Sequence, residues 1–314
     1  MIFCHNEVEI YQNAPDGVVA TVGFFDGVHQ GHRFLIEQVR KRALRQSLAS
    51  AIFTFDVHPR SVLQDGYEPA LLSSFPEKMM ELSGTGVDYC VVLHFTKELA
   101  SLTAKEFIQE VLWKQYRVRT LLVGYDHRFG HNRAEGFEEY VAYGRECGMD
   151  IVHVLPYDVG NVRVSSSAIR RMLAEGEVER ANELLVHPYQ LQGNVIHGDG
   201  LGEQLGFPTA NLDLFDKHKV VPKPGVYAVW VDTDEMRYKG MLYIGDRPTV
   251  DGPHDPRIEV HLLHFSGNLY GEFVRVTFVH YMRDNTKFDT LEALKQQLKR
   301  DRDDADILLI RRHG

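Results

Sequence analysis

Residues 23–32 read GFFDGVHQGH, and this stretch joins two elements of different kinds. The run VVATV at residues 18–22 before it is almost wholly apolar, as expected of a buried parallel strand. After it, apolar side chains recur at the spacing of one helix face, at Leu35, Ile36, Val39 and Ala43. The stretch is therefore predicted to be a strand-to-helix turn, in which Gly23, Gly27 and Gly31 let the backbone approach a ligand closely.

Two histidines of this turn, His29 and His32, are three residues apart and point the same way if they lie in the first helical turn. A helix N-terminus offers free backbone N–H groups and a positive dipole end, which together favour an anion. Two added imidazoles suit a polyphosphate whose charge rises during group transfer. An ordinary capping pair or a metal site would use the same residues, although the sequence nearby offers no obvious third ligand. The glycines and Asp26 around the pair favour the phosphate site.

The amino-acid composition limits the classes of protein to which this chain can belong. The 314 residues suffice for two domains, and 44% hydrophobic with 25% charged residues is typical of a globular chain. A net charge of −9 without a long basic block argues against a nucleic-acid binder. Three scattered cysteines without a CxxC pair predict neither a disulfide framework nor a zinc site. With no signal-peptide pattern or membrane-length apolar run, we expect a cytoplasmic protein that binds no membrane and needs no obligate protein partner.

In the first half, strand-like and helix-like segments alternate. Further strands are expected at residues 50–55, 87–93, 120–123 and 150–154, and TAKE at 103–106 reads as a capping box that opens a helix. Strands separated by helices indicate an α/β domain, with a parallel sheet, helices on both faces and ligands at the carboxyl ends of the strands. GxGxxG and Walker A patterns are absent.

Polar clusters follow three of these strands. Their residues are Asp56, His58 and Arg60; Asp126, His127, Arg128 and Asn132; and Ser165, Ser166, Ser167 and Arg170. Each serine taken alone reads as a helix N-cap, but an Arg one turn further on can bind phosphate bidentately. Since loops at neighbouring strand ends converge, the three clusters and the 23–32 turn are predicted to form one pocket.

The pattern changes after residue 185, and residues 186–189 read as a linker. We therefore expect one domain over 1–185 and another over 186–314. In the second, strand-like runs at 189–196, 225–231, 239–244, 258–265 and 272–278 predict a closed antiparallel barrel. A last helix is expected behind Thr290, because Leu291, Leu294 and Leu298 recur at three and four. The fold class is α/β followed by β.

The chemistry of the second half centres on HGDGLGEQLGFPTANLD, residues 197–213. Its glycines, among them Gly198 and Gly206, make a close-approach loop around Pro208. Thr209 and Asn211 are two apart, and their oxygens are suited to Mg²⁺. Glu259 lies in the strand RIEVHLLHF, where a carboxylate can accept a proton from a hydroxyl that attacks a γ-phosphate. A plain loop and a solvent-facing glutamate are the alternative interpretations.

The first half resembles the nucleotidyltransferase half of prokaryotic bifunctional riboflavin kinase/FAD synthetases. The resemblance lies in GFFDGVHQGH, TFDVHPR, VGYDHRFG and VSSSAIRRMLAEGEVERANELL, in that order. It implies a Rossmann-like domain that transfers AMP from ATP to FMN, giving FAD and pyrophosphate. No covalent nucleophile is needed, since the phosphate of FMN can itself attack.

The same resemblance implies roles for residues. His29 and His32 would grip the ATP phosphates, with Arg170, Ser165 and Ser166 closing from the other side. Asp126 would lie near the adenosine or flavin part. The remaining nucleotide-binding positions are Gly23, Phe24, Asp26, Gly27 and Gly31. Ser167 replaces a more usual threonine, and His127 stands where many members have phenylalanine.

The second half resembles riboflavin kinase. The motifs are GNVIHGDGLGEQLGFPTANL, PGVYAV, YKGMLYIGDRPT, IEVHLLHFSGNLYGE and MRDNTKF. Thr209 and Asn211 match a pair associated with Mg-ATP, Glu259 matches the catalytic base, and Gly198, Gly206, Pro208 and Arg283 match binding positions. Glu203 replaces a common arginine and Asn285 a usual acidic residue.

The resemblance as a whole implies an enzyme that makes FMN from riboflavin and ATP, and FAD from FMN and ATP, with Mg²⁺ at both sites. Two alternatives remain. One is an FAD synthetase whose second domain only binds flavin. The other is a flavin sensor without turnover, against which Glu259 argues, because binding alone needs no base.

Overall fold

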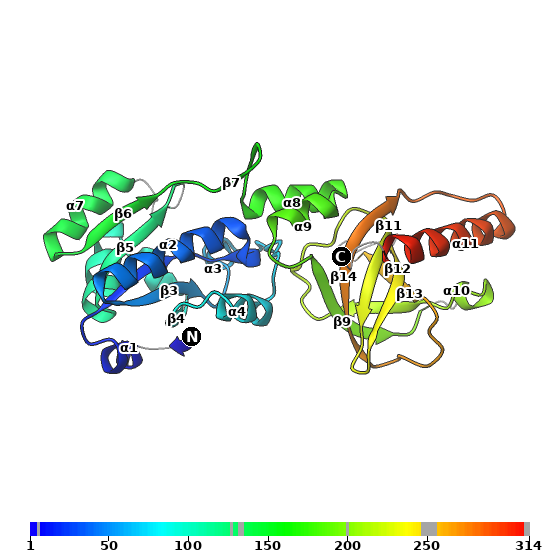
Figure 1. Ribbon diagram of the computed structural model, residues 1–314, viewed down its shortest axis with the longest axis horizontal. Helices are drawn as coiled ribbons and strands as arrows, with labels where there is room; N and C mark the ends of the chain where they lie inside the picture. Colours follow the sequence, from blue (N-terminus) through cyan, green and yellow to red (C-terminus); the bar gives the residue numbers. More distant parts are fainter. Residues whose placement is uncertain (5–6, 126–127, 131–134, 199–200, 246–255, 311–314) are drawn as a thin grey trace. The chain divides into compact units, whose positions relative to one another are not determined.

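The computed structural model describes residues 1–4, 7–125, 128–130, 135–198, 201–245 and 256–310. The chain forms two compact units, Met1–Ser166 and Ser167–Gly314, whose helices and strands are drawn in Figure 1. The units divide inside the VSSSAIRRML segment, upstream of the expected linker. In the described ranges, no helix combines the length and the apolar character needed to cross a membrane.

The first unit is built on a parallel sheet, as predicted. Its strand order is β1-β4-β3-β2-β5-β6. The bounds are β1 Ile2–Cys4, β2 Val18–Val22, β3 Ala49–Phe55, β4 Tyr89–Leu93, β5 Val118–Gly124 and β6 Asp150–Val154. The edge strand β1, which the sequence analysis did not identify, pairs in parallel with β4. A small hairpin, β7 Asp158–Val159 and β8 Val162–Arg163, follows β6 before the serine cluster and was also not foreseen.

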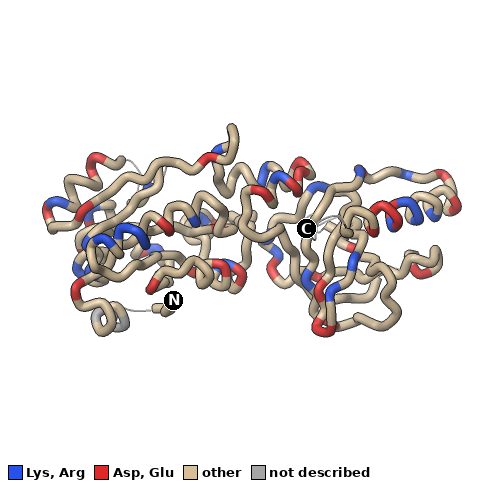
Figure 2. Tube along the Cα trace, viewed as in Figure 1, with Lys and Arg blue, Asp and Glu red and all other residues tan. Residues whose placement is uncertain are grey.

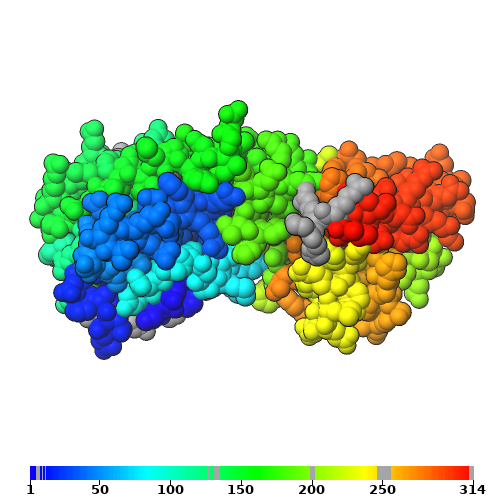
Figure 3. Space-filling view, in the orientation of Figure 1, coloured from blue at the N-terminus to red at the C-terminus, as the bar shows by residue number. Residues whose placement is uncertain are grey.

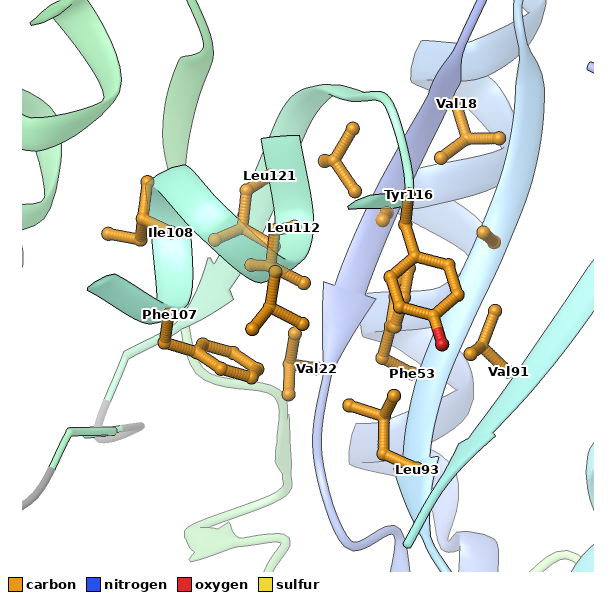
Figure 4. Packing of buried hydrophobic residues seen from close by; sticks show 14 of the residues in the cluster. Val18, Val22, Phe53, Val91, Leu93, Phe107, Ile108, Leu112, Tyr116 and Leu121 are labelled. Atoms are coloured by element: carbon orange, nitrogen blue, oxygen red, sulfur yellow. The ribbon is translucent and has the colours of Figure 1, made fainter. Parts of the chain in front are cut away.

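Helices cover both faces of this sheet because alternate strand residues point to opposite sides. Val18, Ala20 and Val22 pack with one group of helices, which are α1 Glu7–Asn13, α6 Ala104–Glu106, the π-helix Phe107–Gln115 and α7 Phe137–Cys147. Figure 4 shows this core, in which Val22 and Phe53 of the strands lie in one cluster with Leu112 of the π-helix. On the other side, Val19 packs against α2 Gln30–Gln46.

Local signals explain where several helices begin. Thr103 and Glu106 form the predicted capping box of α6. Ser74 and Glu77 form another at the start of α4 Phe75–Ser83. Two short helices, α3 Pro59–Leu63 and α5 Lys97–Ser101, follow the carboxyl ends of β3 and β4.

The second unit contains the predicted closed antiparallel barrel, with strand order β10-β13-β12-β11-β14-β9. The bounds are β9 Gln190–Ile196, β10 Ala210–Leu214, β11 Gly225–Asp232, β12 Arg237–Gly245, β13 Arg257–Leu262 and β14 Phe273–Arg283. Strand β10 was not among the strands expected from the sequence. A short helix, α10 Leu201–Gln204, lies in the glycine-rich loop before it.

The terminal helix α11, Leu291–Leu308, packs on the barrel. Thr290 is its N-cap as predicted, and its hydroxyl accepts a hydrogen bond from Ala293 N. Leu294 and Leu298 lie against a cluster of buried barrel residues that includes Phe207, Ala228 and Met241. In Figure 3 the red α11 lies directly beside the yellow part of the barrel.

Two helices that precede the barrel belong to the second unit. They are α8 Ser166–Glu175, apart from its first residue, and α9 Val178–Leu184. Asn182 of α9 donates from Nδ2 to Phe278 O of β14 (2.9 Å) and accepts from Tyr189 N (2.7 Å). These bonds tie α9 to the barrel.

Candidate active sites

The turn after β2 is held in an uncommon backbone conformation. Phe25 and Val28 have positive φ angles of 56° and 32°, a region that aromatic and β-branched residues seldom occupy, and Gly27 has φ 74°. Such residues cost on the order of 1–3 kcal/mol each and persist where surrounding structure imposes them, often at functional sites. The short 3₁₀ turn Asp26–Val28 then leads to α2, whose first residue is Gln30.

Asp26 is the group that fixes this turn. Its buried carboxylate accepts hydrogen bonds from Leu72 N (2.9 and 3.0 Å) and Ser73 N (3.1 Å). Gly27 N donates in turn to Ser73 Oγ (3.0 Å). A buried carboxylate bound to backbone N–H groups anchors a loop. The structure thus shows Asp26 bracing the motif, while a direct contact between Asp26 and a nucleotide remains a prediction.

His29 and His32 lie side by side, as their spacing predicts. Their rings stack with centroids 3.6 Å apart and planes 16° apart, and His29 is buried. His29 is the N-cap of α2, where its Nδ1 accepts a hydrogen bond from His32 N (3.3 Å). Since Nδ1 is an acceptor there, the neutral ring has its proton on Nε2. The two imidazoles therefore sit at the positive end of a 17-residue helix.

Two of the three polar clusters lie against this turn. His58, the N-cap of α3, makes an edge-on contact with Phe24, with ring centroids 4.9 Å apart. Ser166 Oγ donates to Asp26 O (3.1 Å). Next to it, Val164 O lies so close to Gly31 that a Cβ there would be 3.2 Å from it. The segment that leads into the serines thus leaves little room for a side chain at Gly31.

The other expected members of the pocket stay predictions. Asp126 and His127 lie outside the described residues. Arg170 belongs to the second unit, so its expected approach to His29 is not tested. The Asp56 carboxylate is engaged in hydrogen bonds with neighbouring residues. Although burial opposes its ionisation, hydrogen bonds from His94 and from Phe95 N and Val57 N outweigh that effect and hold its pKa below the usual value.

A buried lysine that the sequence analysis did not identify lies beneath Phe24. Lys78 of α4 is 2% exposed and donates from Nζ to Phe55 O (2.8 Å), at the end of β3. Its ammonium lies 4.0 Å from the centroid of the Phe24 ring. Burial lowers the pKa of Lys78 to about 8, although the Asp26 and Asp56 carboxylates and the Cys90 thiol act in the opposite direction.

In the barrel, the predicted kinase residues meet at the pairing of β10 with β13. Thr209 Oγ1 donates to Glu259 Oε2 (2.9 Å), and Asn211 pairs with Glu259 in the strand register. Arg257 forms an ion pair with Glu259 Oε1. Glu259 is therefore not the solvent-facing residue of the alternative interpretation: its side chain is 15% exposed.

Thr209, Arg257 and Glu259 line a cavity of about 550 Å³, a volume typical of small-molecule sites, whereas Asn211 is not among its lining residues. Its polar lining includes Arg257, Glu259 and His261 of β13 and Thr209 directly before β10. Phe288, Leu291, Leu294 and Leu298 supply apolar surface from α11 and the segment before it. His261 donates from Nδ1 to Pro208 O (2.8 Å), a carbonyl that can only accept. Burial lowers the pKa of His261 despite this bond.

The glycine-rich loop packs closely on Asn211 and on the backbone of Phe207. A Cβ at Gly198 would lie 2.0 Å from Asn211 Nδ2, and one at Gly202 would lie 2.4 Å from Phe207 O. Gly206 has φ +81°, which favours glycine. The loop around Pro208 is therefore shaped by its glycines.

Arg283 lines the cavity together with Asn285. Asn285 donates to Ile244 O (3.0 Å), so it has a defined structural partner where the resemblance suggests an acidic residue. Glu203 is exposed and does not line the cavity.

Comparison with known families accounts for both halves. The model described as FAD synthetase matches residues 11–168, and the model described as riboflavin kinase matches residues 185–309. A bifunctional riboflavin kinase/FMN adenylyltransferase from Escherichia coli K12 is 39% identical over 291 residues, which cover 92% of each chain. The chain belongs to the bifunctional riboflavin kinase/FMN adenylyltransferase family.

Other members of the family are similar over comparable lengths. The proteins from Pseudomonas fluorescens and Bacillus subtilis are 38% and 33% identical and share 91% of both chains. A crystal structure described as a macrolide-efflux protein from Streptococcus pneumoniae has a TM-score of 0.84 and 31% identity, over 97% of this chain and 98% of that one. The extent of these matches agrees with the resemblance seen in the sequence.

Several residues of the two sites had only weak sequence signals. His261 and Arg257 flank Glu259 at two-residue spacing, which places all three on one face of β13. Asp301 continues the spacing of Leu294 and Leu298 along α11. Its signal in the sequence was therefore an acidic residue on the apolar face of a helix. For Lys78, nothing local distinguished it from an exposed helical lysine.

Proposed function

We propose that this chain phosphorylates riboflavin with ATP to give FMN, and transfers AMP from a second ATP to FMN to give FAD and pyrophosphate. The observation that carries the proposal is the placement of Glu259 beside Thr209 in a cavity large enough for a small ligand. Membership of the bifunctional family supports the second activity in the same chain.

For the kinase, Glu259 is the proposed general base. Its carboxylate would accept the proton of the terminal ribityl hydroxyl as that oxygen bonds to the γ-phosphorus and the bond to ADP breaks. Arg257 supplies a positive charge next to the carboxylate. The apolar residues of α11 would contact the flavin ring, which leaves the ribityl chain to extend toward Glu259.

Mg²⁺ is proposed at Thr209 and Asn211. A hydroxyl, an amide oxygen and a nearby carboxylate form the oxygen-rich donor set that a hard cation prefers, and the Thr209–Glu259 bond brings two of them together. When bound, the ion would neutralise charge on the ATP phosphates.

For adenylyl transfer, we propose that the N-terminus of α2 with His29 and His32 binds the ATP phosphates. A phosphate oxygen of FMN would attack the α-phosphorus while the bond to pyrophosphate breaks. The protein would orient the reactants and stabilise charge. Gly23, Gly27 and Gly31 would allow close approach, and Ser165, Ser166 and Arg170 would add donors. A cytoplasmic location is proposed with this function, since its substrates are soluble cofactors.

A chromatographic time course with riboflavin, ATP and Mg²⁺ tests the proposal. FMN appearing first, followed by FAD, is the expected result. FAD formed from added FMN with no product from riboflavin would instead leave the second unit as a flavin-binding module. Binding of flavin without turnover of either substrate would indicate a sensor.

A further inference from the structure

The barrel contains a buried ion pair that joins Arg283 of the MRDNTKF motif to Asp301, a residue outside the quoted motifs. Asp301 of α11 is 2% exposed. It accepts hydrogen bonds from Arg283 Nη2 (2.7 Å) and Arg283 Nε (3.0 and 3.2 Å), which is the bidentate geometry of a strong guanidinium–carboxylate pair. Both residues line the cavity that contains Glu259.

Further bonds fix the orientation of this pair. Gln297 Nε2 donates to Asp301 Oδ1 (2.9 Å), and Arg283 Nη1 donates to Asp284 O (3.0 Å). A guanidinium has five N–H donors, and these bonds use one each on Nε, Nη1 and Nη2. Within the described residues, the other two N–H groups remain for a ligand in the cavity.

A second ion pair on the same helix serves as a comparison. Asp306 of α11 accepts from Lys239 of β12 (2.6 Å), and Lys239 also donates to Asp306 O (3.1 Å). This pair also joins α11 to the barrel, but neither residue lines the cavity. Figure 2 shows acidic and basic residues following one another along α11, so neither aspartate stands out by charge alone.

We propose that Asp301 is a positioning residue of the kinase site, which holds the Arg283 guanidinium so that its remaining N–H groups bind acceptor oxygens of the flavin ring. The proposal rests on the function proposed above. A freely rotating arginine would lose conformational entropy on binding, whereas a clamped one has its donors in place beforehand. The terminal helix is then part of the flavin site and not only a cover for the barrel.

The test compares D301N with its matched control D306N in the full chain. We expect D301N to raise the riboflavin KM, and the riboflavin Kd measured by flavin fluorescence without ATP, by at least roughly tenfold, the loss expected when a hydrogen bond to a charged group is no longer made. The ATP KM and the conversion of FMN to FAD should change less than about twofold. D306N, which breaks the other ion pair of α11, should leave the riboflavin Kd unchanged.

A double-mutant cycle with R283K separates positioning from general stability. If Asp301 acts through Arg283, adding D301N to R283K should cost little further riboflavin affinity, because the interaction is already lost. Additive losses, or equal losses for D301N and D306N, would overturn the proposal. A raised ATP KM with unchanged riboflavin Kd would also overturn it, by assigning Arg283 to the nucleotide.

The proposal can still be tested if D301N does not fold or if the wild-type chain has no kinase activity. If D301N does not fold, D301E decides: it keeps the charge but displaces the guanidinium, and an unchanged riboflavin Kd in it would reject the proposal. If the wild-type chain binds riboflavin but does not phosphorylate it, the proposed function fails while the Kd comparison still tests Asp301.

Discussion

Thr209 Oγ1 lies 2.9 Å from Glu259 Oε2, across the pairing of β10 with β13. The hydroxyl donates to the carboxylate, and Arg257 holds its other oxygen. The two residues are 50 positions apart in the chain, and only closure of the barrel brings them together. This contact makes the PTAN segment and the IEVHLL strand one site.

Thr209→Val should test that contact. Valine keeps the shape of threonine but removes the hydroxyl, so the Glu259 carboxylate loses a donor and the proposed Mg²⁺ loses a ligand. We expect the rate of FMN formation to fall on the order of 10- to 100-fold. Thr209→Ser, the matched control, should retain most of the activity. Equal activity of the two variants would contradict a role for the hydroxyl.

Glu259→Gln should separate the two reactions. An amide cannot accept the ribityl proton, so riboflavin phosphorylation should fall about 10²- to 10⁴-fold. Conversion of supplied FMN to FAD should persist, as measured by chromatography. Glu203→Gln is the control, because Glu203 is exposed. Loss of both activities in Glu259→Gln would refute the assignment of separate sites.

Substitutions at His29 should distinguish its structural role from its chemical role. His29→Ala removes both the imidazole and the cap of α2, with an expected stability loss of about 1 kcal/mol. His29→Asn supplies another good N-cap, so its melting temperature should recover while FAD synthesis stays impaired. Riboflavin phosphorylation in the same chain serves as the control. Full FAD synthesis by His29→Asn would remove this imidazole from the site.

Because of Lys78, the free energy of unfolding should rise as the pH rises in the alkaline range. Its pKa is lowered from 10.5 to about 8 by burial, so the folded chain holds the proton less tightly than the unfolded chain. The cost of charging Lys78 is therefore fully present below about pH 8 and is relieved as pH rises toward 10.5. This cost of charging buried Lys78 is roughly 3 kcal/mol.

Lys78→Met removes this titration. From about pH 7 to about pH 10, the free energy of unfolding of the wild type should rise relative to that of the variant by up to about 3 kcal/mol. Chemical denaturation at several pH values measures it. Lys41→Met, at an exposed position on α2, is the matched control for loss of a lysine. A constant difference between wild type and Lys78→Met would mean that Lys78 keeps its proton over this range.

The bonds of Asn182 bear on where the chain can be cut. A fragment that starts at residue 186, at the expected linker, loses α9 and with it the two hydrogen bonds of Asn182 to Phe278 O and Tyr189 N. We expect it to keep riboflavin phosphorylation but to be less stable, by about 1–3 kcal/mol, than a fragment that starts at residue 167. Thermal unfolding of the two fragments provides the comparison. Equal stability would show that α9 is dispensable.

Helices and strands with a clear hydrophobic period or a capping residue could be predicted from the sequence. The buried strands around GFFDGVHQGH, the capping box at Thr103 and the terminal helix behind Thr290 were all predicted. β1 has only three residues, too few for a period, and β10 is hidden behind the glycines and proline that precede it. Such short strands are fixed by their partners.

In the sites too, local features could be predicted from the sequence and long-range contacts could not. Spacing alone predicted that His29 and His32 lie side by side. It could not predict that Asp26 is bound by Leu72 and Ser73, or that Arg283 is bound by Asp301, because these contacts join distant parts of the chain. Local patterns therefore predict which residues form the sites, but not which neighbours hold them.

Closure of the barrel has a consequence for self-association. A closed sheet has no edge, so β9 to β14 present no unpaired strand to another molecule. The parallel sheet, in contrast, ends at β1 and β6, whose outer backbone groups have no strand partner among the described residues. Edge-to-edge aggregation is therefore expected to start in the first unit. Charged substitutions on the exposed positions of β1, such as Ile2, are the place to improve solubility without touching either site.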